Sequence, residues 1–107
     1  MSDLLANIHQ LVRKGQVNIS DHGYDELAAD GLFARDIISS IKEAKIVEEY
    51  LDYPKGPCIL VLQRNREGQP VHVVWGIPKG KTSPAVLVTA YRPDPQRWEE
   101  GFMRRKK

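Results

Sequence analysis

Apolar residues near the start of the chain recur at the spacing of an amphipathic helix. Four of them share one helical face at positions i, i+4, i+7 and i+8: Leu4, Ile8, Leu11 and Val12. This spacing predicts a helix over residues 3–14, followed by Gly15 as its C-cap. Residues 17–19 then form a short extended stretch.

Two further helices are predicted before residue 45. The second begins at Ser20 or Asp21, because both residue types cap helix N-termini, and ends at Gly31. Three of its residues are expected to form its buried stripe: Tyr24, Leu27 and Ala28. The third covers residues 34–44 and carries apolar residues along one side: Ile37, Ile38, Ile41 and Ala44.

From residue 45 onward the pattern becomes that of strands. Residues 45–53 alternate loosely, and three apolar segments follow: 58–65, 70–78 and 85–91. The loops between the last three are about 4–6 residues long, which predicts an antiparallel meander. Because helices come first and a sheet second, we expect an α+β fold with N-terminal helices packed on a roughly four-stranded antiparallel sheet.

Strand alternation predicts which side chains share a face of this sheet. Along 70–77, one face carries Val71, Val73 and Trp75, and the other carries His72, Val74 and Gly76. Along 85–91, Ala85, Leu87, Thr89 and Tyr91 are expected to alternate with Val86, Val88 and Ala90. His72 and Tyr91 therefore lie on neighbouring strands. One face packs on the helices and the other is left open.

The chain has 107 residues, which predicts one domain over residues 1–107 with a modest core. Its parts are a helical segment at 1–44, a sheet at 45–93 and a basic C-terminal tail at 94–107. No apolar run approaches the ~20 residues of a membrane helix, and the N-terminus lacks the layout of a signal peptide. We therefore expect a cytoplasmic protein with no membrane contact.

Charge is unevenly distributed although the net charge is only +2. The last eleven residues hold five basic residues against Glu99 and Glu100, whereas residues 21–36 are mainly acidic. A basic tail can contact phosphates, and it can equally be a solvated tail that keeps the protein soluble.

Metal and cofactor chemistry are not expected. The three histidines (His9, His22 and His72) lie far apart in the sequence, without the close spacing of metal ligands. The single cysteine, Cys58, begins an apolar strand and is interpreted as a small core residue. No glycine-rich phosphate loop is present.

RNA cleavage by the neighbouring 2′-hydroxyl remains open, because it needs only a base, an acid and a cation. The candidates for catalysis are His22, His72, Tyr91 and Arg92. The candidates for substrate binding are Arg64, Trp75, Lys79, Lys81 and Trp98, with the tryptophans stacking on bases. Core packing is the alternative for each aromatic side chain, and solubility is the alternative for each basic loop residue.

Three segments together resemble a known family: "ISDHGYDELAADGL" at 19–32, "GQPVHVV" at 68–74 and "TAYRPDPQRW" at 89–98. They resemble the DUF4258 domain family, which is similar to RelE-, BrnT- and MqsR-like toxins of the barnase/RelE-like superfamily. The resemblance covers roughly residues 17–105. It implies a metal-independent endoribonuclease of a type II toxin–antitoxin system. It also implies a small antitoxin partner, in some cases one with a zinc finger and a helix-turn-helix, and RNA as substrate.

The resemblance also assigns positions. Five residues match the family's motifs: His22, Cys58, His72, Tyr91 and Pro93. Relatives carry one or two arginines after the early histidine, where this chain has Glu26 or Leu27 and Asp30. This departure removes a cation that could hold the scissile phosphate.

Two other classes of function are therefore kept beside the ribonuclease. The first is a protein-binding module without catalysis, in which the acidic helix and the sheet serve a partner. The second is a single-stranded nucleic-acid binder that uses Trp75, Lys79, Lys81 and the basic tail. Pro93 and Pro95 end the last strand in every case, because proline cannot donate to a strand ladder.

Overall fold

The fold is known from a computed structural model that describes residues 3–106. Its elements in chain order are α1 (Asp3–Arg13), β1 (Val17–Ile19), α2 (Asp21–Ala29), α3 (Ala34–Ser40), a 3₁₀ turn η1 (Ile41–Glu43), β2 (Lys45–Tyr50), β3 (Cys58–Arg64), β4 (Pro70–Gly76) and β5 (Ala85–Tyr91). The third helix is thus shorter than predicted and ends in the 3₁₀ turn. Within residues 3–106, no helix is both long enough and apolar enough to cross a bilayer.

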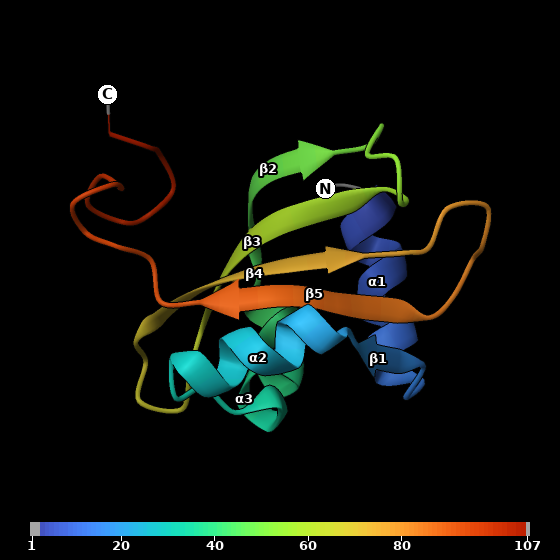
Figure 1. The fold of residues 1–107 in the computed structure, drawn as a ribbon, viewed down its shortest axis with the longest axis horizontal. Coiled ribbons are helices and arrows are strands. Elements are labelled where there is room, and N and C mark those ends of the chain that lie inside the picture. Colours follow the sequence, from blue (N-terminus) through green and yellow to red (C-terminus); the bar gives the residue numbers. More distant parts are fainter. Residues whose placement is uncertain (1–2, 107) are drawn as a thin grey trace.

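The α+β class is confirmed, and the sheet has one strand more than predicted. Its order is β1-β5-β4-β3-β2, with β1 parallel to β5 and every other neighbouring pair antiparallel (Figure 1). The prediction of about four antiparallel strands missed β1, so the sheet is five-stranded and mixed. Three residues are too few to show a strand period, and their pairing with β5 depends on contacts almost seventy residues away.

Helices α1 and α3 cover one face of the sheet and bury its apolar side chains. Ile8 and Ile37 reach 0% exposure there, against a strand face that is also fully buried: Ile59, Val61, Val71, Val73, Trp75, Ala85, Leu87 and Ala90. The alternation predicted for β4 is confirmed by this set. Burial of this continuous apolar face is the main driving force that fixes the strand order.

The face assignment predicted for β5 was wrong in its second half. Val74 pairs with Thr89, but Trp75 pairs with Leu87, so Val88 is an extra residue in a β-bulge. The bulge shifts the alternation by one. Ala90 therefore joins the buried face, and Thr89 and Tyr91 turn to the opposite one.

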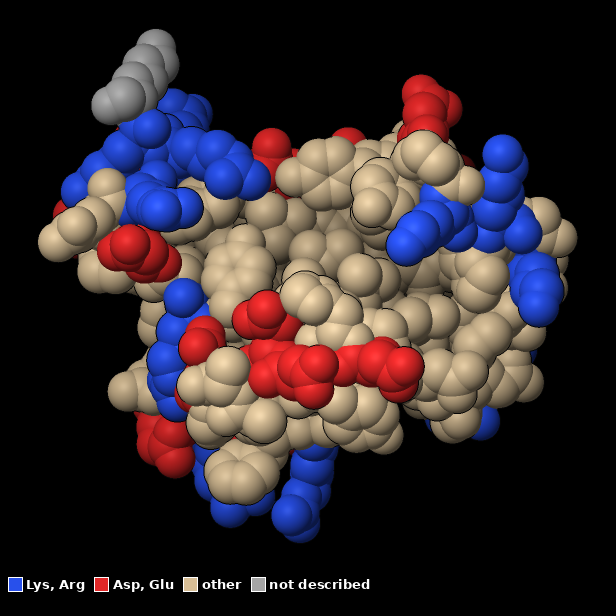
Figure 2. Space-filling view, viewed as in Figure 1, with Lys and Arg blue, Asp and Glu red and all other residues tan. Residues whose placement is uncertain are grey.

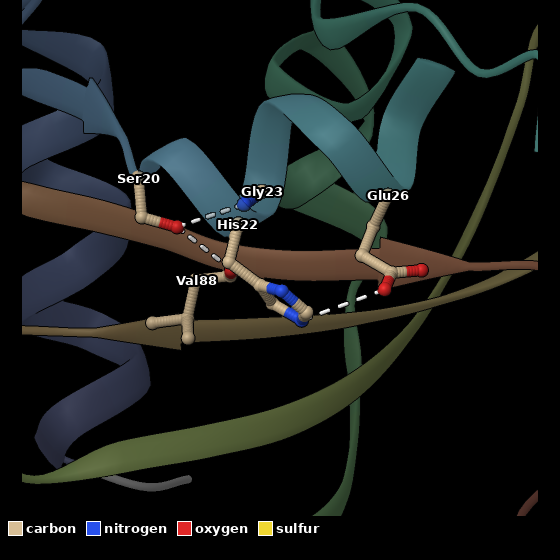
Figure 3. A network of polar contacts seen from close by, with 5 residues as sticks. All are labelled: Ser20, His22, Gly23, Glu26 and Val88. Atoms are coloured by element: carbon tan, nitrogen blue, oxygen red, sulfur yellow. Dashed lines mark hydrogen bonds and ion pairs between the residues drawn. The ribbon is translucent and has the colours of Figure 1, made fainter. Parts of the chain in front are cut away.

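Helix α2 runs along the edge of β5 beyond the point where β1 ends (Figure 1). Ser20 caps it by accepting from the Gly23 N–H, and the same hydroxyl donates to the Val88 carbonyl (Figure 3). A Cβ on Gly23 would lie only 2.7 Å from the Leu87 carbonyl oxygen, so this position requires glycine. The predicted stripe was therefore partly wrong: Gly23 and Leu27 are buried, whereas Tyr24 and Ala28 are exposed.

Candidate functional site

The sheet face opposite α1 and α3, called the open face, is only partly covered. Four of its strand residues are half-buried and line its floor: Val74, Val86, Val88 and Thr89. Figure 2 shows an uncharged area across the upper middle of this view, with a band of acidic groups directly below it over α2. Basic groups lie at both sides, over the β4–β5 loop with Lys79 and Lys81 and over the C-terminal segment.

The C-terminal segment, residues 97–106, folds back over one end of the open face. The Trp98 ring packs edge-on against His72 with centroids 4.4 Å apart and is only 4% exposed. Arg105 lies over the other side of the Trp98 ring at 4.6 Å and makes an ion pair of 2.8 Å with Glu48 on β2. The segment is therefore held to the sheet by one aromatic contact and one partly exposed ion pair, and the cation–π contact joins two residues within the segment.

His72 lies beneath this segment with an exposed fraction of 0%. Its Nε2–H donates to the Phe102 carbonyl oxygen at 2.8 Å, so Nδ1 carries the lone pair in the neutral ring. Nδ1 is buried and has no hydrogen-bond partner within the described residues. Burial lowers the pKa of His72 below its usual value of 6.5, which keeps the ring neutral.

Tyr91 is the neighbour of His72 on the next strand. The two residues are register partners, and their rings meet edge-on at 5.6 Å. The expectation that the two residues lie on neighbouring strands is confirmed, and the structure adds that they are register partners. Burial raises the pKa of Tyr91, with a further increase from Glu48 and an opposing effect of Arg105. The half-buried phenol is therefore protonated at neutral pH and can donate a proton or a hydrogen bond.

His22 lies on the opposite border of the open face, in the first turn of α2. Its side chain is 64% exposed, and Nε2 lies 3.6 Å from the Glu26 carboxylate one turn later (Figure 3). Glu26 had been noted only as a departure from the family pattern. The i, i+4 spacing of the two residues was the signal that could have paired them.

Arg92 was predicted beside Tyr91 as a phosphate ligand, but in the structure its side chain points away from the open face. Successive strand residues point to opposite faces, so Arg92 leaves the open face that Tyr91 joins. Its Nε donates to the Asp30 carbonyl at 3.1 Å, and its Nη1 donates to Gln69 at 2.8 Å. Its backbone N–H donates to the Asp30 carboxylate at 2.8 Å. Arg92 therefore ties the end of α2 to the end of β5, and His22 and His72 do not meet it.

The predicted base-stacking residues are buried. Trp75 is 0% exposed on the helix-covered face, and its indole N–H donates to Gln63 at 2.8 Å. Core packing is therefore the correct interpretation for Trp75, because neither ring face reaches solvent. Trp98 is enclosed between His72 and Arg105. Arg64 is exposed and bonds the carbonyl of Gly68 in its own hairpin, away from the candidates above.

The interpretation of Cys58 as a small core residue agrees with its position. It is 8% exposed on β3, and burial raises the pKa of its thiol, so it stays protonated and unreactive. Across residues 3–106, no group of three or more His, Cys, Asp or Glu side chains is placed to hold a metal ion.

Comparison with protein families gives one match, to a domain of unknown function, DUF4258, over residues 19–92. This stretch is more than half of the chain. The chain belongs to the DUF4258 family. Searches of curated proteins and of solved structures each found no match to it.

The DUF4258 match covers one part of the candidate site and leaves the other part outside. His22, His72, Tyr91 and Arg92 lie inside it. Trp98, Phe102 and Arg105, which cover His72, lie beyond its end. These last two residues were not predicted as part of the site, because their contacts are made by a segment with no strand or helix pattern. The DUF4258 part thus supplies the open face, and the C-terminal segment supplies its cover.

Proposed function

We propose that this chain is the toxin-like component of a type II toxin–antitoxin system and cleaves RNA without a metal ion. The observation that carries the proposal is the open face. Its uncharged floor lies between two basic borders, with the acidic groups of α2 along a third border (Figure 2). Two proton-transfer side chains flank this face: His22 on α2 and Tyr91 at the end of β5. Such a surface fits a single strand, whose phosphates contact the basic borders and whose bases contact the floor.

The fold is consistent with this proposal. We propose that the sheet and its helices represent a RelE/barnase-like arrangement, in which the chemistry is done on the sheet face. The strand rise of ~3.3 Å places Val88, beside the start of α2, about 10 Å along β5 from Tyr91. We propose that the reacting phosphodiester lies along this stretch of β5, between the start of α2 and Tyr91.

In the proposed reaction, His22 takes the proton of the 2′-hydroxyl and the 2′-oxygen attacks phosphorus. The bond from phosphorus to the 5′-oxygen breaks, and that oxygen takes the phenolic proton of Tyr91. The products are a 2′,3′-cyclic phosphate and a 5′-hydroxyl, and solvent returns the two residues to their starting protonation states. Glu26 orients the His22 ring, which is exposed enough to reach the substrate.

His72 has a different role in this proposal. It is buried and neutral and bonded to Phe102, so it packs beside Tyr91 from the neighbouring strand and does not touch RNA. The cation comes from the basic borders of the open face, because Asp30 holds Arg92 on the other side of β5. The charge of the developing phosphorane is then stabilised by an exposed residue of the C-terminal segment such as Arg104, while Lys79 and Lys81, at the other end of β5, contact phosphates further along the strand.

A second function is favoured by two observations. The C-terminal segment covers His72, and Arg92 is fully engaged by Asp30 and Gln69. A non-catalytic protein-binding module of the same fold would have this arrangement, with the open face occupied by a partner. Single-stranded nucleic-acid binding without cleavage is weakened by the burial of Trp75 and Trp98.

The test is cleavage of a fluorescent single-stranded RNA by the purified chain in excess EDTA. We expect products ending in a 2′,3′-cyclic phosphate. His22→Ala should lower the rate by about 10²–10⁴-fold, because it removes the general base. His9→Ala is the matched control, since it removes a histidine from α1 on the helix-covered side.

Equal melting temperatures for the two variants are required for a comparison of their rates. Equal loss of cleavage in His9→Ala and His22→Ala would refute the catalytic role of His22. Absence of cleavage by wild type, together with RNA binding or with stable binding to an antitoxin-type protein, would replace the ribonuclease by one of the other two functions.

A further inference from the structure

Strand β1 is an edge strand whose outer main-chain groups are free. Gln16 O accepts from Ala85 N–H, and Ser20 N–H donates to Leu87 O, so the even-numbered residues bond to β5 in this parallel register. The N–H and C=O groups of Val17 and Ile19 therefore point away from β5. Within residues 3–106 they have no hydrogen-bond partner. They form a short template for one more strand.

An apolar groove lies along this same edge, between the C-terminal end of α1, β1, and the facing parts of α2 and α3. Its volume is about 490 Å³. Most of its lining is apolar: Val12, Val17, Ile19, Tyr24 and Ile38. Tyr24 stays 59% exposed although it is a large aromatic residue. We call this feature the β1 groove. A groove beside free main-chain groups matches what strand addition requires: hydrogen bonds for affinity and a pocket for alternate side chains.

The charges beside the β1 groove have opposite signs at its two ends. Arg13 and Lys14 precede β1 at the end of α1, and Asp21 and Asp25 follow it at the start of α2. All four are exposed, and within the described part of the chain none makes an ion pair. An occupant with one acidic and one basic end would therefore find a partner for each charge.

We propose that the β1 groove binds an extended segment of a partner protein, which pairs with β1 as a sixth strand. The segment runs antiparallel to β1, because antiparallel pairs are the more stable, and places alternate apolar side chains in the groove. Its N-terminal end is basic and lies near Asp21 and Asp25, and its C-terminal end is acidic and lies near Arg13 and Lys14. A small apolar ligand would leave the Val17 and Ile19 main-chain groups unused.

This surface is separate from the proposed RNA surface. The β1 groove is lined by α1, β1 and α3 together with Tyr24 of α2, and none of the proposed RNA residues is among its lining. His22 and Tyr91 border the open face. Partner binding thus goes beyond the proposed ribonuclease. It can be tested by a measurement in which no RNA is present.

The probe is an acetylated and amidated heptapeptide, Lys-Val-Thr-Leu-Thr-Val-Glu, added to the whole chain labelled with ¹⁵N. We expect saturable shifts of the Val17, Asn18 and Ile19 amide signals. The same peptide with N-methyl groups at the positions facing β1 should bind at least about tenfold more weakly, because it cannot donate main-chain hydrogen bonds. Equal affinity of the two peptides would overturn strand addition.

A matched pair of variants tests the location. Tyr24→Arg places a charge at the β1 groove and should weaken binding about tenfold or more. Tyr53→Arg, at a comparably exposed tyrosine in the loop after the opposite edge strand β2, should not change it. The proposal is wrong if the shifts map to β2, if Tyr24→Arg binds like wild type, or if neither unmodified nor N-methylated peptide binds. It is also wrong if the free chain is a dimer that Tyr24→Arg dissociates, since a second copy would then fill the groove.

Discussion

Strand β4 buries two polar side chains completely, one on each face of the sheet, and the two differ in their hydrogen bonding. Trp75 faces the helices and donates to Gln63, whose amide donates in turn to Ile37 O at 2.7 Å and Ser40 Oγ at 2.8 Å. His72 faces the other way and has one bond, to Phe102 O, and one orphan nitrogen.

The difference lies in what covers each side chain. Helix α3 covers Gln63 and brings a carbonyl and a hydroxyl at fixed positions. A loop-like segment covers His72 and brings one carbonyl, while Arg105, which holds the segment in place, is largely exposed. A polar network with every group bonded makes a core rigid, whereas a half-bonded group is a place where the structure can change at low cost. The helix-covered face is therefore the scaffold, and the open face is where adjustment and function are expected.

Among the tests of this comparison, Gln63→Leu is expected to have the largest effect. The change keeps the volume of the side chain but leaves the Trp75 indole N–H without its acceptor in the core and removes one of the donors to the Ile37 carbonyl. We expect the free energy of unfolding to fall by about 3 kcal/mol. Urea unfolding measures it, with Gln10→Leu on the exposed side of α1 as the control. A loss no greater than in the control would mean that the Trp75 network is not a source of rigidity.

A smaller effect is expected from Trp98→Ala on the open face. Trp98 is as buried as a core residue, but the segment that carries it can detach without unfolding the sheet. We expect a loss of about 1–2 kcal/mol, well below the cost of removing a tryptophan from a rigid core. Hydrogen exchange should show faster exchange in residues 97–106 and unchanged protection in β3. Loss of protection in β3 as well would show that the segment is part of the scaffold.

The sequence predicts those parts of the fold that depend on residues close together in the chain, and it misses those that depend on distant contacts. Periodicity located α1, α2 and the four antiparallel strands, because each pattern is local. It marked residues 17–19 as extended but did not place them in the sheet, because their pairing is with β5, and it missed the bulge at Val88, which reverses Thr89 and Ala90. It also expected Tyr24 to be buried, whereas the close approach of α2 to β5 leaves room only for Gly23.

The candidate site was predictable only in part, for the same reason. That His72 and Tyr91 lie on neighbouring strands follows from the meander, but their position on the same face depends on the bulge at Val88, which the sequence did not predict. The position of Arg92 depends on Asp30, and the cover of His72 depends on Phe102, contacts that span 62 and 30 residues. Residue type alone made Trp75 and Trp98 candidates for stacking, and only their packing excludes it.

The smallest effect, and the most specific to the open face, is a dependence of stability on pH that comes from His72. Burial lowers its pKa below 6.5, so below that pH the unfolded chain binds a proton that the folded chain does not. The free energy of unfolding then rises with pH in this window. The contribution is complete above pH 6.5 and is lost progressively as the pH falls toward the lower folded pKa. Gln63 and Trp75 do not titrate and add nothing to it.

Urea unfolding at a series of pH values from about 8 to about 5 measures this slope. The slope should be shallower in His72→Gln than in wild type, whatever the stability of the variant at neutral pH. His9→Gln should keep the wild-type slope, because it leaves His72 and its cover unchanged. If His72→Gln kept the wild-type slope, the ring would have to bind its proton equally well in the folded and unfolded chains. The C-terminal segment would then be open in solution, and the contrast between the two faces of β4 would be larger than the buried His72 indicates.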